Sequence, residues 1–250
     1  MKRNHQSRFV YSWVIIPRSQ SLCYNRIMKT VPTLLTLDRF ELSDQLELFQ
    51  PYYDRIQIDI ADGILVPNVT TQIDELSDLI SQGHVEINSK MSFDFHLMVK
   101  NFKAELSKIE KLIAQNIQIN TVLVNASLQP KIDNLIKEFN ISIGLDVSPS
   151  TEIADIASHY DLSRISHIQI MTVEPGFQGS PFLPEMLNKI TQLRDHHYSG
   201  EILIDGGVNS TTIPTIQSCK NPPDVICIGS YLTKAGDDLG SRVDFLKELE

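Results

Sequence analysis

Two aspartates and one histidine stand out as residues that could do chemistry together. Asp59 and His96 each lie within a short apolar run, residues 55–61 (RIQIDIA) and 93–99 (FDFHLMV), and Asp205 lies near the end of a third, 201–206 (EILIDG). Two opposed carboxylates can remove a proton from one face of a carbon beside a carbonyl and return one to the other face. The residues therefore indicate a two-base epimerisation, with Asp59 and Asp205 as catalytic candidates.

The same three side chains form a candidate metal site. Removing the proton leaves an enediolate, and a divalent cation held by Asp59, His96 and Asp205 could stabilise its negative charge as a Lewis acid. Mixed carboxylate and imidazole ligands suit Zn²⁺, Fe²⁺, Mn²⁺ or Co²⁺. Gln57 should share the inward face with Asp59, because side chains alternate along a strand. We expect one divalent metal ion.

Three glycine-bearing segments provide a candidate phosphate site. Glycine lets backbone N–H groups approach an anion closely, and the start of a following helix adds a favourable dipole. The phosphate-binding candidates are Gly176, Gly179, Gly206, Gly207, Gly229 and Ser230. All three segments follow expected strands, so we expect a phosphorylated small molecule as the substrate.

The elements that must position these residues repeat along the chain. Strands are expected at 31–37, 55–61, 93–99, 121–126, 141–147, 167–173, 201–206 and 224–229. Helical periodicity lies between them, for example at 102–115 and 183–194. Strands that alternate with helices pair in parallel through right-handed crossovers, and eight such units close into a barrel. We predict a single (β/α)₈ TIM barrel over residues 28–250, with its chemistry at the carboxyl ends of the strands.

Composition limits the partners. The net charge of −9 and the pI near 5.2 argue against a broad nucleic-acid surface. No apolar run approaches the roughly 20 residues that span a bilayer, so no membrane partner is expected. Three scattered cysteines fit a reducing cytoplasm. Residues 1–27 hold a short apolar stretch, 9–16, without a clean cleavage site, and we interpret them as a non-structural extension rather than a targeting signal.

Five segments together resemble the ribulose-phosphate 3-epimerase family, whose barrel is of the ribulose-phosphate-binding type. They occur in the family's order at 32–36 (PTLLT), 59–68 (DIADGILVPN), 94–98 (DFHLM), 171–177 (MTVEPGF) and 205–208 (DGGV). The resemblance implies interconversion of D-ribulose 5-phosphate and D-xylulose 5-phosphate. It implies that Asp59 and Asp205 are both acid/base residues and metal ligands, and that His96 is a ligand. The substrate-binding positions that it implies are Thr33, Asn68, Met98 and Met171.

The chain also departs from the family's pattern. Gln57 stands where the family has a metal-binding histidine, so the resemblance makes Gln57 the fourth metal residue but a weaker zinc ligand. Ala61 replaces a methionine, which should open space near the reacting carbons, and Thr33 replaces a serine. In the phosphate loop, Gln178 occupies a position where the family usually has a glycine, and Ser180 one where it usually has a glutamine.

Alternative functions follow from these departures. The leading hypothesis is a metal-dependent epimerase of ribulose 5-phosphate or a close ketose phosphate, which could include a six-carbon one. The second is a phosphate-binding barrel that has lost catalysis and acts by binding. A third, a lyase of the orotidine-phosphate decarboxylase type, would need an Asp-x-Lys-x-x-Asp stretch, whereas residues 94–96 read Asp-Phe-His. Assembly into a homo-oligomer is left open.

Overall fold

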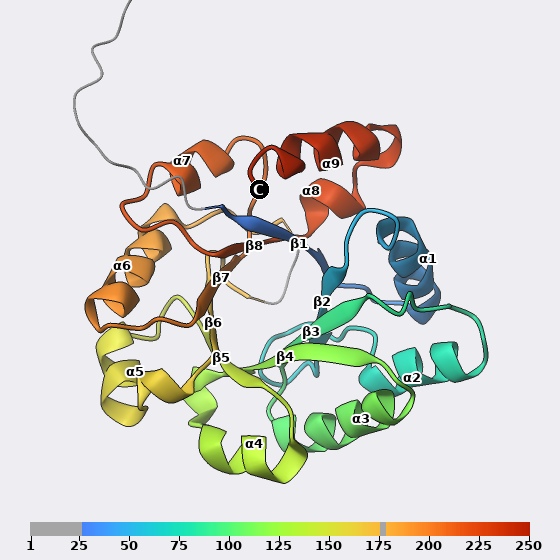
Figure 1. The fold of residues 1–250 in the computed structure, drawn as a ribbon, viewed down its shortest axis with the longest axis horizontal. Helices are drawn as coiled ribbons and strands as arrows, with labels where there is room; N and C mark the ends of the chain where they lie inside the picture. The colour runs from blue at the N-terminus through green and yellow to red at the C-terminus, as the bar shows by residue number, and fades with distance from the viewer. Residues whose placement is uncertain (1–26, 176–178) are drawn as a thin grey trace, which may run out of the picture.

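A computed structural model describes residues 27–175 and 179–250, and within them eight parallel strands close into a barrel in chain order. The strands are β1 (Lys29–Leu34), β2 (Arg55–Ala61), β3 (Ser92–Met98), β4 (Gln118–Asn125), β5 (Ile143–Val147), β6 (His167–Met171), β7 (Glu201–Asp205) and β8 (Val225–Ile228). Figure 1 shows them at the centre of a ring of helices. The predicted single (β/α)₈ barrel is confirmed.

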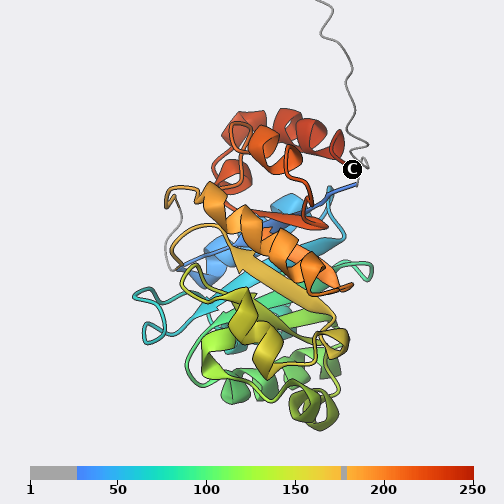
Figure 2. The ribbon, with the colours of Figure 1, turned by 90° about the vertical axis from the view of Figure 1, so that its left-hand side faces the viewer.

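The helices follow the strands and cover their outer faces. They are α1 (Arg39–Phe49), α2 (Ile73–Ser81), α3 (Phe102–Ala114), α4 (Ile132–Phe139), α5 (Ile153–His159), α6 (Asn188–Asp195), α7 (Ile213–Gln217), α8 (Ser230–Thr233) and α9 (Leu239–Lys247). In the side view of Figure 2, the red helices near the carboxyl terminus lie at the top, the orange helix α6 crosses in front of the strands, and the green and yellow elements lie at the bottom. No helix in the described ranges is long and apolar enough to cross a membrane.

Several predicted boundaries shift by a few residues. The first strand ends at Leu34 rather than at residue 37, since Asp38 already caps α1 by accepting from the backbone N–H groups of Phe40 and Glu41. The helical stretch predicted at 183–194 begins as a 3₁₀ turn, Pro184–Leu187, before α6 starts at Asn188. No candidate catalytic or metal-ligating residue is moved off its strand, whereas the phosphate candidates Gly206 and Gly229 lie just past the ends of β7 and β8.

The barrel interior is built in levels, because inward side chains recur at every second residue. An apolar cluster fills part of this interior and comprises Val31, Leu123, Leu203, Val225 and Cys227. Toward the amino ends of the strands, Arg55 closes the barrel by pairing with Asp94 and Glu201, both at 2.8 Å. The polar residues at the carboxyl ends of the strands are therefore supported from below by a barrel interior that is filled with side chains.

The carboxyl terminus lies beside the start of β1. The backbone N–H and the hydroxyl of Thr30 both donate to Oε1 of Glu250, at 2.9 and 2.7 Å. Apart from the exposed Ile27, the predicted extension over residues 1–27 lies outside the described residues.

Candidate active site

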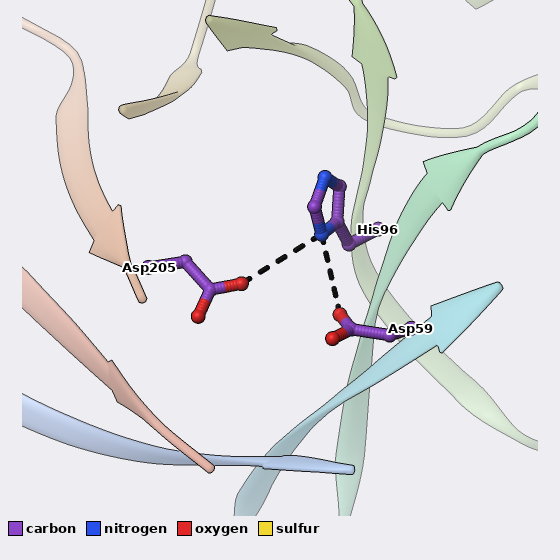
Figure 3. Close-up of side chains that lie close together, drawn as sticks. All are labelled: Asp59, His96 and Asp205. Atoms are coloured by element: carbon purple, nitrogen blue, oxygen red, sulfur yellow. Dashed lines mark hydrogen bonds and ion pairs between the residues drawn. The ribbon is translucent and has the colours of Figure 1, made fainter. Parts of the chain in front are cut away.

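Asp59, His96 and Asp205 converge at the carboxyl end of the barrel, from β2, β3 and β7. The Nδ1 atom of His96 lies 3.2 Å from Oδ1 of Asp59 and 3.7 Å from Oδ2 of Asp205. Figure 3 shows the imidazole reaching between the two carboxylates, which project from different sides. The parallel register places Asp59 directly beside His96 on the neighbouring strand. The sequence-predicted cluster is therefore assembled as one unit.

Two threonines fix the backbone under the carboxylates. The hydroxyl of Thr70 donates to the carbonyl of Asp59 at 2.8 Å and accepts from the N–H of Ala61 at 2.9 Å. The N–H and hydroxyl of Thr172 both donate to the carbonyl of Asp205, at 2.7 and 3.0 Å. All these groups are buried or nearly so, which makes these bonds costly to break.

Burial and mutual repulsion change the proton affinity of the cluster. Burial, followed by the charge of Asp59, raises the pKa of Asp205 to about 8. Burial alone would lower the pKa of His96, but the charges of Asp146 and Asp59 outweigh it and raise that pKa well above its ordinary value. One carboxyl group of the pair thus holds a proton at neutral pH, which is a common arrangement in acid/base sites.

Two glutamines and a thiol lie beneath the carboxylates. Nε2 of Gln57 donates to Oδ2 of Asp205 at 2.9 Å and lies 3.3 Å from Oδ1 of Asp59. Nε2 of Gln169 approaches the same Asp205 oxygen at 3.5 Å, and the Cys227 thiol faces Oε1 of Gln57 at 3.5 Å. Gln57 therefore presents its nitrogen, and a bond from its oxygen to a metal would require the amide to turn over.

The donor set fits a divalent metal ion. Ligand atoms of Asp59, His96 and Asp205 all lie within 4.8 Å of one another, and all three side chains are buried. Tetrahedral coordination at about 2.0–2.2 Å places neighbouring ligand atoms roughly 3.4 Å apart, close to the separations around Nδ1 of His96. Three residues offering two carboxylates and one imidazole could thus hold an ion without large rearrangement.

A cavity of about 550 Å³, including space open to solvent, lies above these side chains. Most of the sequence-predicted residues line it, namely Thr33, Asp59, His96, Met98, Met171, Gly179, Asp205, Gly206, Gly207, Gly229 and Ser230. Gln57 and Asn68 are not among the lining residues, and Gly176 lies outside the described residues. Ala61 packs against Val66 and Met98 and does not line the cavity. The additional space that the replacement of a methionine by Ala61 was expected to open is therefore not part of this cavity.

The loop after β7 needs glycine for steric reasons. Gly206 has a φ of +115°, and a Cβ there would lie 2.4 Å from Cγ2 of Val173. Gly207 has a φ of +68°, and its Cβ would meet the side chain of Phe182 at 2.9 Å. These glycines allow the backbone to turn tightly at the cavity wall directly after Asp205.

Sequence reasoning missed three polar residues around the cluster. Asp146 on β5 lies behind His96, Asn125 at the end of β4 donates to Asp146 at 2.8 Å, and Gln169 on β6 approaches Asp205. The alternation that selected Asp59 would have found Asp146 and Gln169, since each is flanked by buried apolar residues on its strand.

Comparison with known proteins places this site in a family. The profile of the Ribulose-phosphate 3 epimerase family matches residues 29–233, which span all eight strands of the described barrel. The chain belongs to this family of isomerases. The ribulose-phosphate 3-epimerase of Helicobacter pylori (strain ATCC 700392 / 26695) is 32% identical over 216 residues, covering 84% of this chain and 93% of its own length.

Other comparisons agree with this family and with the barrel fold. The ribulose-phosphate 3-epimerase of Methanocaldococcus jannaschii is 27% identical over 227 residues, covering 89% of this chain and 91% of that one. Among solved structures, 3-hexulose-6-phosphate synthase from Salmonella typhimurium covers 89% of this chain and 98% of its own, with a TM-score of 0.60. Its 13% sequence identity supports the fold alone.

Proposed function

We propose that this protein is a metal-dependent epimerase that interconverts D-ribulose 5-phosphate and D-xylulose 5-phosphate. The observation that carries the proposal is the placement of Asp59 and Asp205. The two carboxylates come from different strands, flank His96 Nδ1 at 3.2 and 3.7 Å, and open into one cavity together with the glycine loops. Family membership supports the same reaction, which the relatives' names describe.

The carboxylates divide the proton transfers. In the metal-free cluster the pKa of Asp205 is raised to about 8, so this side chain has a high affinity for a proton and is suited to donate one to C3. Asp59 on the other side removes the C3 proton from the opposite face. In the reverse reaction the roles exchange, so one proton is taken and one is given in each turnover and the C3 configuration inverts.

Asp59, His96 and Asp205 would hold the divalent metal, which would supply Lewis-acid stabilisation of the enediolate oxygens. Met98 and Met171 line the cavity beside them and would exclude water from the reacting carbons. Whether Gln57 joins the ligands depends on its amide orientation, and this role stays a prediction. Zn²⁺, Fe²⁺, Mn²⁺ and Co²⁺ all suit the donor set.

The sugar phosphate would lie across the cavity. Thr33 lines it, and its buried hydroxyl has no hydrogen-bond partner among the described residues, so a sugar hydroxyl would satisfy it. The phosphate would bind at the lining residues Gly179, Gly206, Gly207, Gly229 and Ser230, with Gly176 from the same loop as Gly179. Asn68 remains a candidate from the loop after β2.

A second candidate is a barrel that binds sugar phosphate without turning it over. Gln57 favours it, because its amide nitrogen already occupies a hydrogen-bonding position between the two carboxylates. Catalysis is the better supported function, since Asp59, His96 and Asp205 retain ligand and proton-transfer groups within bonding reach. A cytoplasmic location and assembly into a homo-oligomer stay predictions.

The deciding experiment follows hydrogen exchange at C3 by NMR. The full-length protein is incubated with D-ribulose 5-phosphate in D₂O, with and without added Zn²⁺, Mn²⁺ or Fe²⁺. We expect deuterium at C3 and the appearance of D-xylulose 5-phosphate. Saturable binding of the sugar phosphate without exchange under any metal condition would favour the binding barrel instead.

A further inference from the structure

A third buried carboxylate lies behind His96, on the side away from Asp59 and Asp205. Oδ1 of Asp146 is 3.4 Å from Nε2 of His96, while Nδ1 of the same ring faces the other two carboxylates (Figure 3). We propose that Asp146 is a positioning residue: it accepts a hydrogen bond from the Nε2–H of His96 and so directs the Nδ1 lone pair toward the metal ion. This inference rests on the metal site of the proposed function.

The two facing atoms have no competing partners. Nε2 of His96 and Oδ1 of Asp146 are both buried, and neither makes a hydrogen bond to any other group in the described residues. Buried polar atoms are almost always paired, so each is the natural partner of the other. Their 3.4 Å separation is slightly beyond the usual 2.7–3.2 Å range. A small rotation of the imidazole would close the bond.

Asn125 fixes which oxygen of Asp146 faces the histidine. Oδ1 of Asn125 accepts from the backbone N–H of Ser127 at 3.0 Å, and this N–H can only donate. The amide nitrogen of Asn125 must therefore point the other way, where it donates to Oδ2 of Asp146 at 2.8 Å and to the Ser148 hydroxyl at 2.9 Å. Oδ2 is thus occupied, and Oδ1 is left for His96.

The segment after Asp146 is held from outside the barrel. The ammonium group of Lys189 on α6 donates to the carbonyls of Ser148, Pro149 and Thr151. Lys189 is only 6% exposed, so these bonds are protected from water. Asp146 therefore lies between two anchored neighbours, the Asn125 amide and the Ser148 loop. Its carboxylate is held in place and can set the orientation of the His96 imidazole.

A carboxylate on the far nitrogen of a metal-bound histidine sets the tautomer and makes the ligand more basic. Asp146→Asn should reverse this effect. The oxygen of the introduced amide would accept from Asn125, and its NH₂ group would then face Nε2 of His96 and require a lone pair there. The proton would move to Nδ1, where it blocks the metal. We expect zinc affinity to fall about 10–100-fold, the usual range for losing such a partner.

The charge-conserving swap Asn125→Asp with Asp146→Asn provides the matched rescue. The carboxylate introduced at position 125 would accept from Ser127 and from the new amide at position 146, whose oxygen would again face Nε2–H of His96. We expect most of the zinc affinity to return. Asp94→Asn serves as the control, because Asp94 is equally buried but pairs with Arg55 and Asn120. The zinc affinity of this control should match the wild type.

Two readouts separate this inference from the metal proposal. Zinc affinity is measured by competition with a chelating dye. The ¹⁵N shifts of His96, recorded with or without zinc at a pH where the ring is neutral, report which ring nitrogen carries hydrogen. We expect a protonated Nε2 in the wild type and in the swap, and an unprotonated Nε2 in Asp146→Asn. If zinc fails to bind the wild type, the metal site is wrong, yet the shifts still test the hydrogen bond. An unprotonated Nε2 in the wild type, or unchanged zinc affinity in Asp146→Asn, overturns the role of Asp146.

Discussion

The amide nitrogen of Gln57 lies 2.9 Å from Oδ2 of Asp205, in the position from which a histidine nitrogen could instead bind a metal. A glutamine at this point uses the Asp205 carboxylate as a hydrogen-bond acceptor. An imidazole at the same point would instead bind the metal ion together with that carboxylate. This single contact explains how the chain keeps its carboxylates ordered while offering one nitrogen ligand fewer than the resemblance leads one to expect.

Replacing Gln57 by histidine should therefore strengthen zinc binding. A fourth donor completes tetrahedral coordination, and imidazole is a better zinc ligand than a neutral amide oxygen. We expect at least a roughly tenfold lower zinc dissociation constant for Gln57→His, measured by chelator competition. Gln57→Leu is the control that removes the amide without adding a donor. Equal affinities in the histidine and leucine variants would show that residue 57 lies outside the coordination sphere.

Removing either carboxylate should separate proton exchange from epimerisation. Asp59→Asn and Asp205→Asn should each lower the rate of epimerisation about 10²–10⁴-fold, the usual contribution of a general acid or base. Each variant retains one base, so each should exchange the C3 proton of one epimer only, and the two should differ in which epimer exchanges. NMR in D₂O measures both processes. Wild-type epimerisation rates in either variant would contradict the two-base assignment. The metal content of each variant is measured in parallel, so that a rate lost with the metal ion is distinguished from a rate lost with the base.

The stability of the metal-free protein should depend on Asp205. The ordinary pKa of this group is 3.8 and the folded value is about 8, so the folded chain binds its proton more tightly than the unfolded chain. The resulting stabilisation is present at acid pH and is lost as the pH rises toward about 8. His96 contributes with the same sign, since its pKa is also raised.

Asp205→Asn should accordingly flatten the pH dependence of unfolding. Urea titrations in the presence of a chelator, at intervals from about pH 5 to about pH 9, measure the free energy of unfolding. We expect a smaller decrease toward alkaline pH in the variant than in the wild type. Identical slopes would mean that Asp205 titrates at an ordinary pKa in the folded protein.

The ion-pair cluster at the amino end of the barrel should matter for stability. Arg55 contacts the fully buried Asp94 and the partly buried Glu201, both at 2.8 Å. Arg55→Met would leave a buried carboxylate without its counter-charge, which typically costs about 3–5 kcal/mol. Lys103→Met, which breaks a surface pair with Glu138, should cost about 0–1 kcal/mol. Comparable losses in the two variants, measured by urea unfolding, would count against a specific role for Arg55.

The sequence is sufficient to predict the barrel, because eight expected strands alternate with helices, and most of the cluster, because side chains alternate along each strand with a period of two. The alternation places Gln57 and Asp59 inward and puts His96 on one face with Met98, and the contacts of Gln57 with Asp205 and of His96 with Asp59 agree with this placement. The orientation of the Gln57 amide could not be predicted, since it depends on Asp205, which lies 148 residues further along the chain. The same alternation selects Asp146 as an inward residue, but its contact with His96 could not be predicted, because it forms only when the barrel brings β5 close to β3.

Thr172 holds the carbonyls of both Asp205 and Gly206 from the end of the neighbouring strand. The proposed acid and the proposed phosphate loop are therefore consecutive residues on a backbone that cannot stretch between them. The distance between the proposed acid and the proposed phosphate site is therefore fixed by the backbone. With the proposed function, the site would select a substrate by the number of carbons between the phosphate and the carbon that exchanges its proton, and it would not discriminate by the part of the sugar beyond that carbon.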